Sequence, residues 1–338
     1  QRLRAEVAGD PVAPLGQRMP FAAFNSTETL NTPTRLALHV SGPEDISRIG
    51  EPDAPECRYA YEFVIGSRDG QQAVEYEALY YWPSTAARRV RLFERNAAGG
   101  VTASKAFGLA GYRQALEKVL RPDASVICTL AQLQHPYSSL VWQAAGTLVS
   151  NILIEKAQDS DEGLAQYYAT DSEALASLNR EIQRIDVGIR AVRIKQAPTG
   201  PVVLFEHEGL AHSMPQALES HGTRQFVRLY PYLLDALRRG GVAVIDELDA
   251  AMHPLLLPEI VRWFYDPVRN PHDAQLWMSC HNPSLLEELL KEEILFCEKD
   301  QEGKTSIYSL SDIQSIRRTD NYYRKYMGGS LGAVPQIG

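Results

Sequence analysis

Two adjacent acidic residues, Asp246 and Glu247, directly follow the apolar run Val242–Ile245. An apolar run of this kind is typical of a strand buried in a parallel sheet, and α/β folds bind ligands at the carboxyl ends of such strands. There, one carboxylate could hold Mg²⁺ and the other could polarise an attacking water. Strands that simply end in solvated acids are also common, so this pair needs supporting residues.

Supporting residues lie on both sides of the acidic pair. Downstream, Asp249 follows within Leu248–Pro254, and His281 ends the apolar run 276–280. A lone histidine at a strand end is more often structural, but its place after the acidic pair favours a functional role. Upstream, residues 218–225 lead into a helix.

In that upstream segment, Ser220, Gly222 and Thr223 stand at the expected start of a helix. Unpaired N–H groups and the positive end of the helix dipole attract an anion there, and glycine permits its close approach. The alternative is an ordinary Ser/Thr N-cap followed by a glycine turn.

The remaining sequence predicts the elements that must position these residues. Alternating residues and a turn at 68–70 predict an antiparallel meander over 58–94, and spacings of three and four predict helices from 105 to 187. After Pro198, strands and helices alternate as in a βαβ series with a parallel core. The expected helices are 112–120, 140–156, 171–185, 225–239 (bent by Pro231), 255–265 and 284–291, and the later strands are 202–205, 241–245, 275–280, 294–298 and 306–310.

The order of these motifs resembles that of ABC, SMC and Rad50-like ATPases: signature motif (218–225), acidic strand (242–247), D-loop (248–254) and strand-end histidine (281). Residues 202–338 look like the abortive-infection group of bacterial ABC-type ATPases, including the tail 326–335. The resemblance implies an α/β fold, with an ABC-type ATPase head (a P-loop NTPase core with an antiparallel β subdomain) and a compact helical insert. The implied divisions are an N-terminal lobe over 1–104, the insert over 105–197 and a C-terminal ATPase lobe over 198–338.

The resemblance also implies roles for individual residues. Asp246 would bind Mg²⁺, and Glu247 and His281 would act in ATP hydrolysis. Asp249, as a further nucleotide-binding residue, and His281 would couple the nucleotide state to a neighbouring subunit. The signature residues of one subunit (Ser220, Gly222 and Thr223) would bind the ATP held by another, so hydrolysis implies at least a dimer.

The sequence departs from the family pattern in two features. No GxxxxGK[ST] phosphate loop occurs between Gln1 and Gly338, and we expect it to precede residue 1. If the protein lacks that loop, the head would be a non-catalytic scaffold. His221 stands where the signature motif more often has a small residue.

Members of this group act in anti-phage defence as sensors or scaffolds that control a separate effector. The resemblance therefore implies an effector partner, a nuclease above all, as in PARIS-type systems, and a phage protein or a nucleic acid as the trigger. A DNA-repair ATPase that binds DNA ends is the alternative. The net charge of −8 and the absence of a long coiled-coil pattern count mildly against it.

Composition bears on the cellular location of the protein, on the redox state of its cysteines and on metal binding. No apolar run approaches the roughly 20 residues of a membrane span, and no signal peptide is evident, so we expect a cytoplasmic protein without membrane contact. The scattered cysteines predict reduced thiols, with Cys280 and Cys297 as small core residues. A zinc site at His253, His272, Cys280 and His281 matches no zinc spacing.

Overall fold

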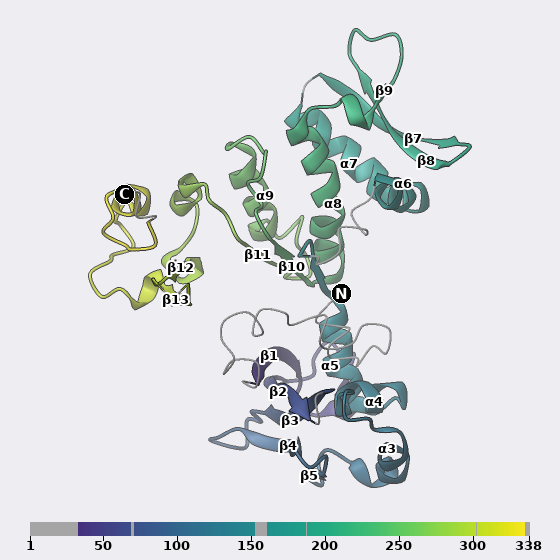
Figure 1. The fold of residues 1–338 in the computed structure, drawn as a ribbon, viewed down its shortest axis with the longest axis vertical. Coiled ribbons are helices and arrows are strands. Elements are labelled where there is room, and N and C mark those ends of the chain that lie inside the picture. Colours follow the sequence, from purple (N-terminus) through teal and green to yellow (C-terminus); the bar gives the residue numbers. More distant parts are fainter. Residues whose placement is uncertain (1–32, 69–70, 153–160, 187, 302, 335–338) are drawn as a thin grey trace. The chain divides into compact units, whose positions relative to one another are not determined.

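The structure is a computed structural model that describes residues 33–68, 71–152, 161–186, 188–301 and 303–334. It consists of two compact units, 1–149 and 150–338, and the elements of each are labelled in Figure 1. The boundary between the units falls inside the segment 105–197. Each unit is described by itself below.

The first unit is built on a five-stranded antiparallel sheet in which each strand pairs with its neighbours in sequence. The meander expected over 58–94 is confirmed, and one more strand pairs at each of its edges. The strands are β1 (Thr34–Pro43), β2 (Glu56–Arg68), β3 (Gln71–Tyr81), β4 (Val90–Arg95) and β5 (Val101–Ala103).

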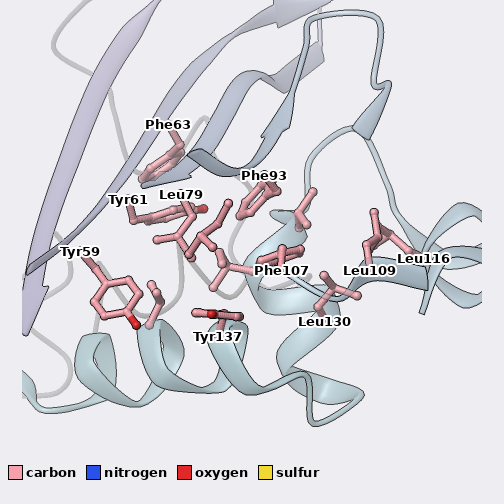
Figure 2. Packing of buried hydrophobic residues seen from close by; sticks show 14 of the residues in the cluster. Tyr59, Tyr61, Phe63, Leu79, Phe93, Phe107, Leu109, Leu116, Leu130 and Tyr137 are labelled. Atoms are coloured by element: carbon pink, nitrogen blue, oxygen red, sulfur yellow. The ribbon is translucent and has the colours of Figure 1, made fainter. Parts of the chain in front are cut away.

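Helices α3 (Arg113–Val119), α4 (Val126–Gln132) and α5 (Pro136–Gly146) supply the other half of this unit's core. Alternation along β2 sends Tyr59, Tyr61 and Phe63 into one cluster, because successive side chains of a strand point to opposite faces. Figure 2 shows these rings packed with Phe93 and Phe107 above the helices.

A charged group lies within this core. Glu77 on β3 is fully buried, and its carboxylate accepts hydrogen bonds from the Val126 N–H (2.7 Å), the Ile127 N–H (3.0 Å) and the Tyr61 hydroxyl (2.8 Å). The Arg95 guanidinium lies 3.9 Å away. Burial raises the pKa of Glu77, and these four donors oppose that change. The carboxylate thereby joins β3 to the first turn of α4.

The helix expected over 140–156 is wrong beyond Gly146. Helix α5 ends there, and Leu148–Ser150 forms a short strand, β6. Two β-branched residues, Thr147 and Val149, favour this change from helix to strand. The end of the expected helix, residues 153–156, lies outside the described residues.

The second unit contains the expected parallel core. Strand β10 (Val242–Ile245) pairs in parallel with β11 (Gln275–Met278), in a sheet of order β11-β10-β6. Helices α8 (His221–Arg239) and α9 (Leu256–Tyr265) pack on this pair, beside which they are drawn in Figure 1. The protein is thus of the expected α/β class.

A second, antiparallel sheet of this unit joins β7 (Ile189–Ala197), β8 (Gly200–His207) and β9 (Met214–Pro215). The expected strand 202–205 lies within β8, whereas no sequence pattern had indicated β7. Helices α6 (Asp161–Thr170) and α7 (Ser172–Ile185) pack against β8 and β7 respectively. The helix expected over 171–185 is confirmed as α7.

Helix α8 carries Pro231 in its interior, as expected. Proline has no N–H, so the carbonyl of Val227, four residues earlier, has no helical donor. The Tyr168 hydroxyl of α6 donates to that carbonyl at 2.8 Å. Tyr168 is almost fully buried, and burial keeps its pKa well above the ordinary value, so the hydroxyl stays a donor.

The C-terminal part of this unit has a small core of its own around Phe296, Leu310 and Tyr322. Strands β12 (Leu295–Lys299) and β13 (Thr305–Ser309) pair as expected, and α10 spans Tyr322–Met327. The helix expected over 284–291 is wrong: two short 3-10 helices, η7 (Pro283–Glu287) and η8 (Lys291–Glu293), stand there.

Two further observations concern the expectations from composition. Cys297 is exposed on β12, so its expected place in the core is wrong, and Cys280 is half-buried. In the ranges that the structure describes, no helix is both long and apolar enough to span a bilayer.

Candidate functional site

The acidic pair lies at the carboxyl end of the parallel sheet. Ile245 pairs with Met278 in the last register position of β10 and β11, so Asp246 and Ser279 are the first residues beyond the two strands. The carboxyl-bearing residues Asp246 and Glu247 are both exposed. This edge of the sheet is the place where a ligand can reach both carboxylates.

Ser279 holds the acidic pair through three hydrogen bonds. Its hydroxyl donates to Asp246 Oδ1 at 2.5 Å and accepts the Glu247 N–H at 2.8 Å. Its carbonyl accepts the Leu248 N–H at 3.1 Å. The pairing of β10 with β11 therefore continues into the turn that carries both carboxylates.

Glu247 adopts an unusual backbone conformation, with φ of +50°. For a residue with a Cβ, the left-handed region costs about 1–2 kcal/mol. The bond between its N–H and the Ser279 hydroxyl holds it in that conformation. Backbone strain of this kind concentrates at sites where a side chain must be aimed.

Asn151 contacts the same turn from the other neighbouring strand of the sheet. Its side chain accepts the Asp246 N–H at 2.7 Å and donates to the Asp246 carbonyl at 2.9 Å. Asn151 falls within the helix expected over 140–156, and its sequence position predicted no role for it. Its one sequence signal is its place two residues after Val149, at the end of a short stretch with two β-branched residues, Thr147 and Val149. That signal can be interpreted only once β6 is known to lie beside β10.

Asp249 is tied to the residues that follow β11. Its Oδ2 accepts the backbone N–H of His281 at 3.1 Å, while its Oδ1 is buried and has no hydrogen-bond partner among the residues that the structure describes. His281 itself is exposed. Asp249 and the strand-end histidine therefore lie together, joined through the histidine backbone.

Between Ser279 and His281 lies Cys280, whose pKa burial raises to about 11. At pH 8 only on the order of one thiol in a thousand would be the reactive thiolate. We therefore expect iodoacetamide to modify Cys280 far more slowly than the exposed Cys297, as followed by mass spectrometry of the peptides. Equal rates at the two cysteines would show that Cys280 is not shielded.

The signature residues stand where α8 begins. Ser220 is the N-cap: its hydroxyl accepts the Thr223 N–H at 3.1 Å and lies 2.8 Å from the Thr223 hydroxyl. The Thr223 hydroxyl also donates to Asp186 at the end of α7, at 3.3 Å. The capping geometry is thus present, and Ser220 is exposed.

The residue before the cap is also fixed. The Glu219 carboxylate accepts the Ser220 N–H at 2.8 Å, and His207 Nε2 at the end of β8 lies 2.7 Å from its other oxygen. The side chains of His207 and Glu219 are mostly buried. This pair joins the β7–β8 hairpin to the start of α8.

Gly222 brings the signature segment against the D-loop segment. A Cβ at this position would lie 2.7 Å from the backbone carbonyl oxygen of Ala251. Ala251 has φ of +60° and lies two residues after Asp249. Among the described residues, no hydrogen bond joins Ser220 or Thr223 to the two carboxylates, so the signature segment meets the acidic turn through its D-loop side.

This contact predicts the effect of replacing Gly222 with alanine. Alanine is the better helix former by about 1 kcal/mol, but its methyl group would force the Ala251 backbone to move. We expect a net loss of about 1–3 kcal/mol in the free energy of unfolding, measured by urea denaturation. Gly111→Ala is the matched control, because a Cβ there has nothing within 4 Å; an equal or smaller effect at Gly222 would contradict the close contact.

Residues 129–287 match an AAA domain. The family model is described as "AAA domain, putative AbiEii toxin, Type IV TA system". The matched residues run from within α4 to the end of η7, and so include the acidic pair, Asp249 and His281. The match supports an AAA or ABC-type ATPase for this part of the chain.

Two other comparisons add less. A solved structure, "Crystal structure of the SmcHead bound to the C-winged helix domain of ScpA", is similar to 80% of this chain over 81% of its own length, at 11% identity and a TM-score of 0.33. At that score the likeness supports no further conclusion. None of the curated proteins matches the sequence.

Proposed function

We propose that this protein is an ATP-binding and ATP-hydrolysing ABC-type head that works as an oligomer. The observation that carries it is the acidic pair at the carboxyl end of β10, which Ser279 and Asn151 hold in place. It lies in the segment that matches an AAA domain. A strand end that merely carried solvated acids would not need four side-chain hydrogen bonds to fix its turn.

The donor set suits ATP and Mg²⁺. Mg²⁺ prefers carboxylate oxygens and keeps several waters, and Asp246 is exposed with one carboxylate oxygen, Oδ1, bonded to Ser279. In the proposed site Asp246 would hold Mg²⁺, and the ion would supply positive charge beside the phosphates. Glu247 orients and polarises the attacking water, and the exposed His281 contacts the γ-phosphate.

A second subunit supplies the other half of the site. Ser220, Gly222 and Thr223 lie at the start of the 19-residue helix α8, where N–H groups and the helix dipole favour a phosphate. Because Gly222 packs on the D-loop segment, these residues and Asp249 are presented together. In the proposed dimer both face the nucleotide of the neighbouring copy.

The test uses the natural gene product, because hydrolysis by such a head needs a phosphate loop and residues 1–338 show none. We expect Mg²⁺-dependent ATP hydrolysis whose rate per subunit rises with protein concentration, together with ATP-dependent dimers in analytical ultracentrifugation. Ser220→Ala and Glu247→Gln subunits, each impaired alone, should regain activity when mixed, because one composite site of the mixed dimer is intact. A rate independent of concentration, with no recovery on mixing, would refute the composite site.

At the level of the cell, we propose a role in anti-phage defence as a sensor or scaffold that controls a separate effector. The description of the matched family, which names a toxin of a toxin–antitoxin system, supports this direction. The resemblance favours a nuclease as effector and a phage protein or nucleic acid as trigger. Loss of phage protection when Glu247→Gln replaces the wild type in its operon would support the role; equal plaque counts would contradict it.

A further inference from the structure

We propose that Ser279 and Asn151 are positioning residues that aim the Asp246 carboxylate at the metal and the Glu247 side chain at the water. The inference rests on the proposed function and assigns a task to two residues that lie outside the recognised motifs. The two residues flank β10 on opposite sides, one after β11 and one after β6, in the sheet order β11-β10-β6.

Ser279 controls the side chain of Asp246. A hydroxyl has a single proton to donate, and Ser279 gives it to Asp246 Oδ1. That bond fixes the rotation of the carboxylate and directs its metal-binding capacity to Oδ2, for which no protein donor is found among the described residues. Without the hydroxyl, the exposed carboxylate could rotate freely and would bind the metal less well.

The same hydroxyl controls the backbone of Glu247. It accepts the Glu247 N–H, and that bond helps to offset the cost of a positive φ at a residue with a Cβ. If the acceptor is lost, this residue can relax to a negative φ and its side chain then points elsewhere. One serine oxygen therefore determines the orientation of both acidic side chains.

Asn151 fixes the peptide groups on which both side chains depend. Its amide bonds the N–H and the carbonyl of Asp246 at once, which only a side chain with both a donor and an acceptor can do. Aspartate at this position keeps the acceptor, loses the donor and adds a negative charge beside the Asp246 carbonyl. Asn151→Asp is therefore a sharper test than alanine, because it preserves the size of the side chain.

The experiment compares Ser279→Ala, Ser279→Thr and Asn151→Asp in the full-length protein. Two quantities are measured: binding of Mn²⁺ with ATP by electron paramagnetic resonance, and the dependence of kcat on Mg²⁺ concentration. Loss of a group that orients a metal ligand typically costs about 10–100-fold in metal affinity or activity. We expect a loss of that size for Ser279→Ala and Asn151→Asp, and recovery of most of it by Ser279→Thr, which restores the hydroxyl.

Controls separate positioning from folding. Ser306→Ala on β13, an exposed serine in the same unit, should leave both quantities unchanged, and all variants should keep the wild-type melting temperature within a few degrees. A shift in metal affinity at Ser279→Ala without rescue by threonine would overturn the role of the hydroxyl.

The outcomes also distinguish this inference from the proposed function. If the wild type hydrolyses ATP while Ser279→Ala and Asn151→Asp keep wild-type metal affinity and kcat, the positioning role alone is wrong. A wild-type protein that neither binds Mn²⁺ with ATP nor hydrolyses ATP overturns the proposed function and this inference together.

Discussion

Glu247→Gln is expected to abolish ATP turnover in the full-length protein and to trap a closed, ATP-bound oligomer. Glutamine keeps the size of the side chain but cannot polarise water as a carboxylate does, and a positioned general base contributes about 10²–10⁴-fold to rate. The backbone bond to Ser279 does not involve the carboxylate, so the turn should stay intact. Steady-state hydrolysis and sedimentation in the presence of ATP measure the two effects.

The matched control is Glu173→Gln, which removes one carboxylate from the exposed first turn of α7. It should hydrolyse ATP at the wild-type rate and dissociate after hydrolysis as the wild type does. An unchanged hydrolysis rate in Glu247→Gln would refute the assignment of this residue, however well the variant folds.

The second large effect concerns stability. Replacing Glu77 with alanine should lower the stability of the first unit by about 3–5 kcal/mol, because the change leaves Arg95 buried without its counter-charge. It also leaves the N–H groups of Val126 and Ile127 without their acceptors. Hydrogen exchange of the full chain should report this loss as faster exchange across β3 and α4.

A local readout makes this test specific. The amides of Val126 and Ile127 should lose protection first, whereas peptides around β10 and β11 in the second unit should exchange as before. Glu56→Ala, at the exposed start of β2, is the control and should leave all peptides unchanged. Wild-type protection of α4 in Glu77→Ala would mean that the buried carboxylate contributes little.

The parts of the fold that were predictable from sequence are those with a local signal. The fully apolar run before Asp246 predicted β10, because buried parallel strands show this pattern, and the next apolar run predicted β11. The alternation in Tyr59–Ile65 likewise predicted β2. In each case neighbouring residues alone carry the information.

The predictions that proved wrong are those in which the local pattern of apolar residues differs from the structure that the rest of the fold imposes. Apolar spacing continues past Gly146, so the helix was extended through what is β6, although pairing with β10 decides the outcome there. After Pro283, spacing favoured one helix where two 3-10 turns stand. Cys297 lies in an apolar run, but on a two-stranded sheet one face stays exposed.

The motif residues of the candidate site were predictable from sequence, whereas the residues that hold them in place, Asn151 and Ser279, were not. The position of Asp246 and Glu247 directly after an apolar run predicts their functional role. Asn151 lies 95 positions from Asp246 and Ser279 lies 33 positions from it. Their bonds exist only because the sheet aligns three strand ends, and a single sequence holds no record of that alignment. The left-handed backbone of Glu247 is hidden for the same reason.

The proline of α8 constrains the order in which residues 168 and 231 can be substituted during evolution. Pro231 frees the Val227 carbonyl, and Tyr168 satisfies it. An ancestor that lost the tyrosine first would have buried an unsatisfied oxygen, while one that lost the proline first would have given the carbonyl a second donor at little cost. Related sequences should therefore contain the tyrosine without the proline more often than the proline without the tyrosine.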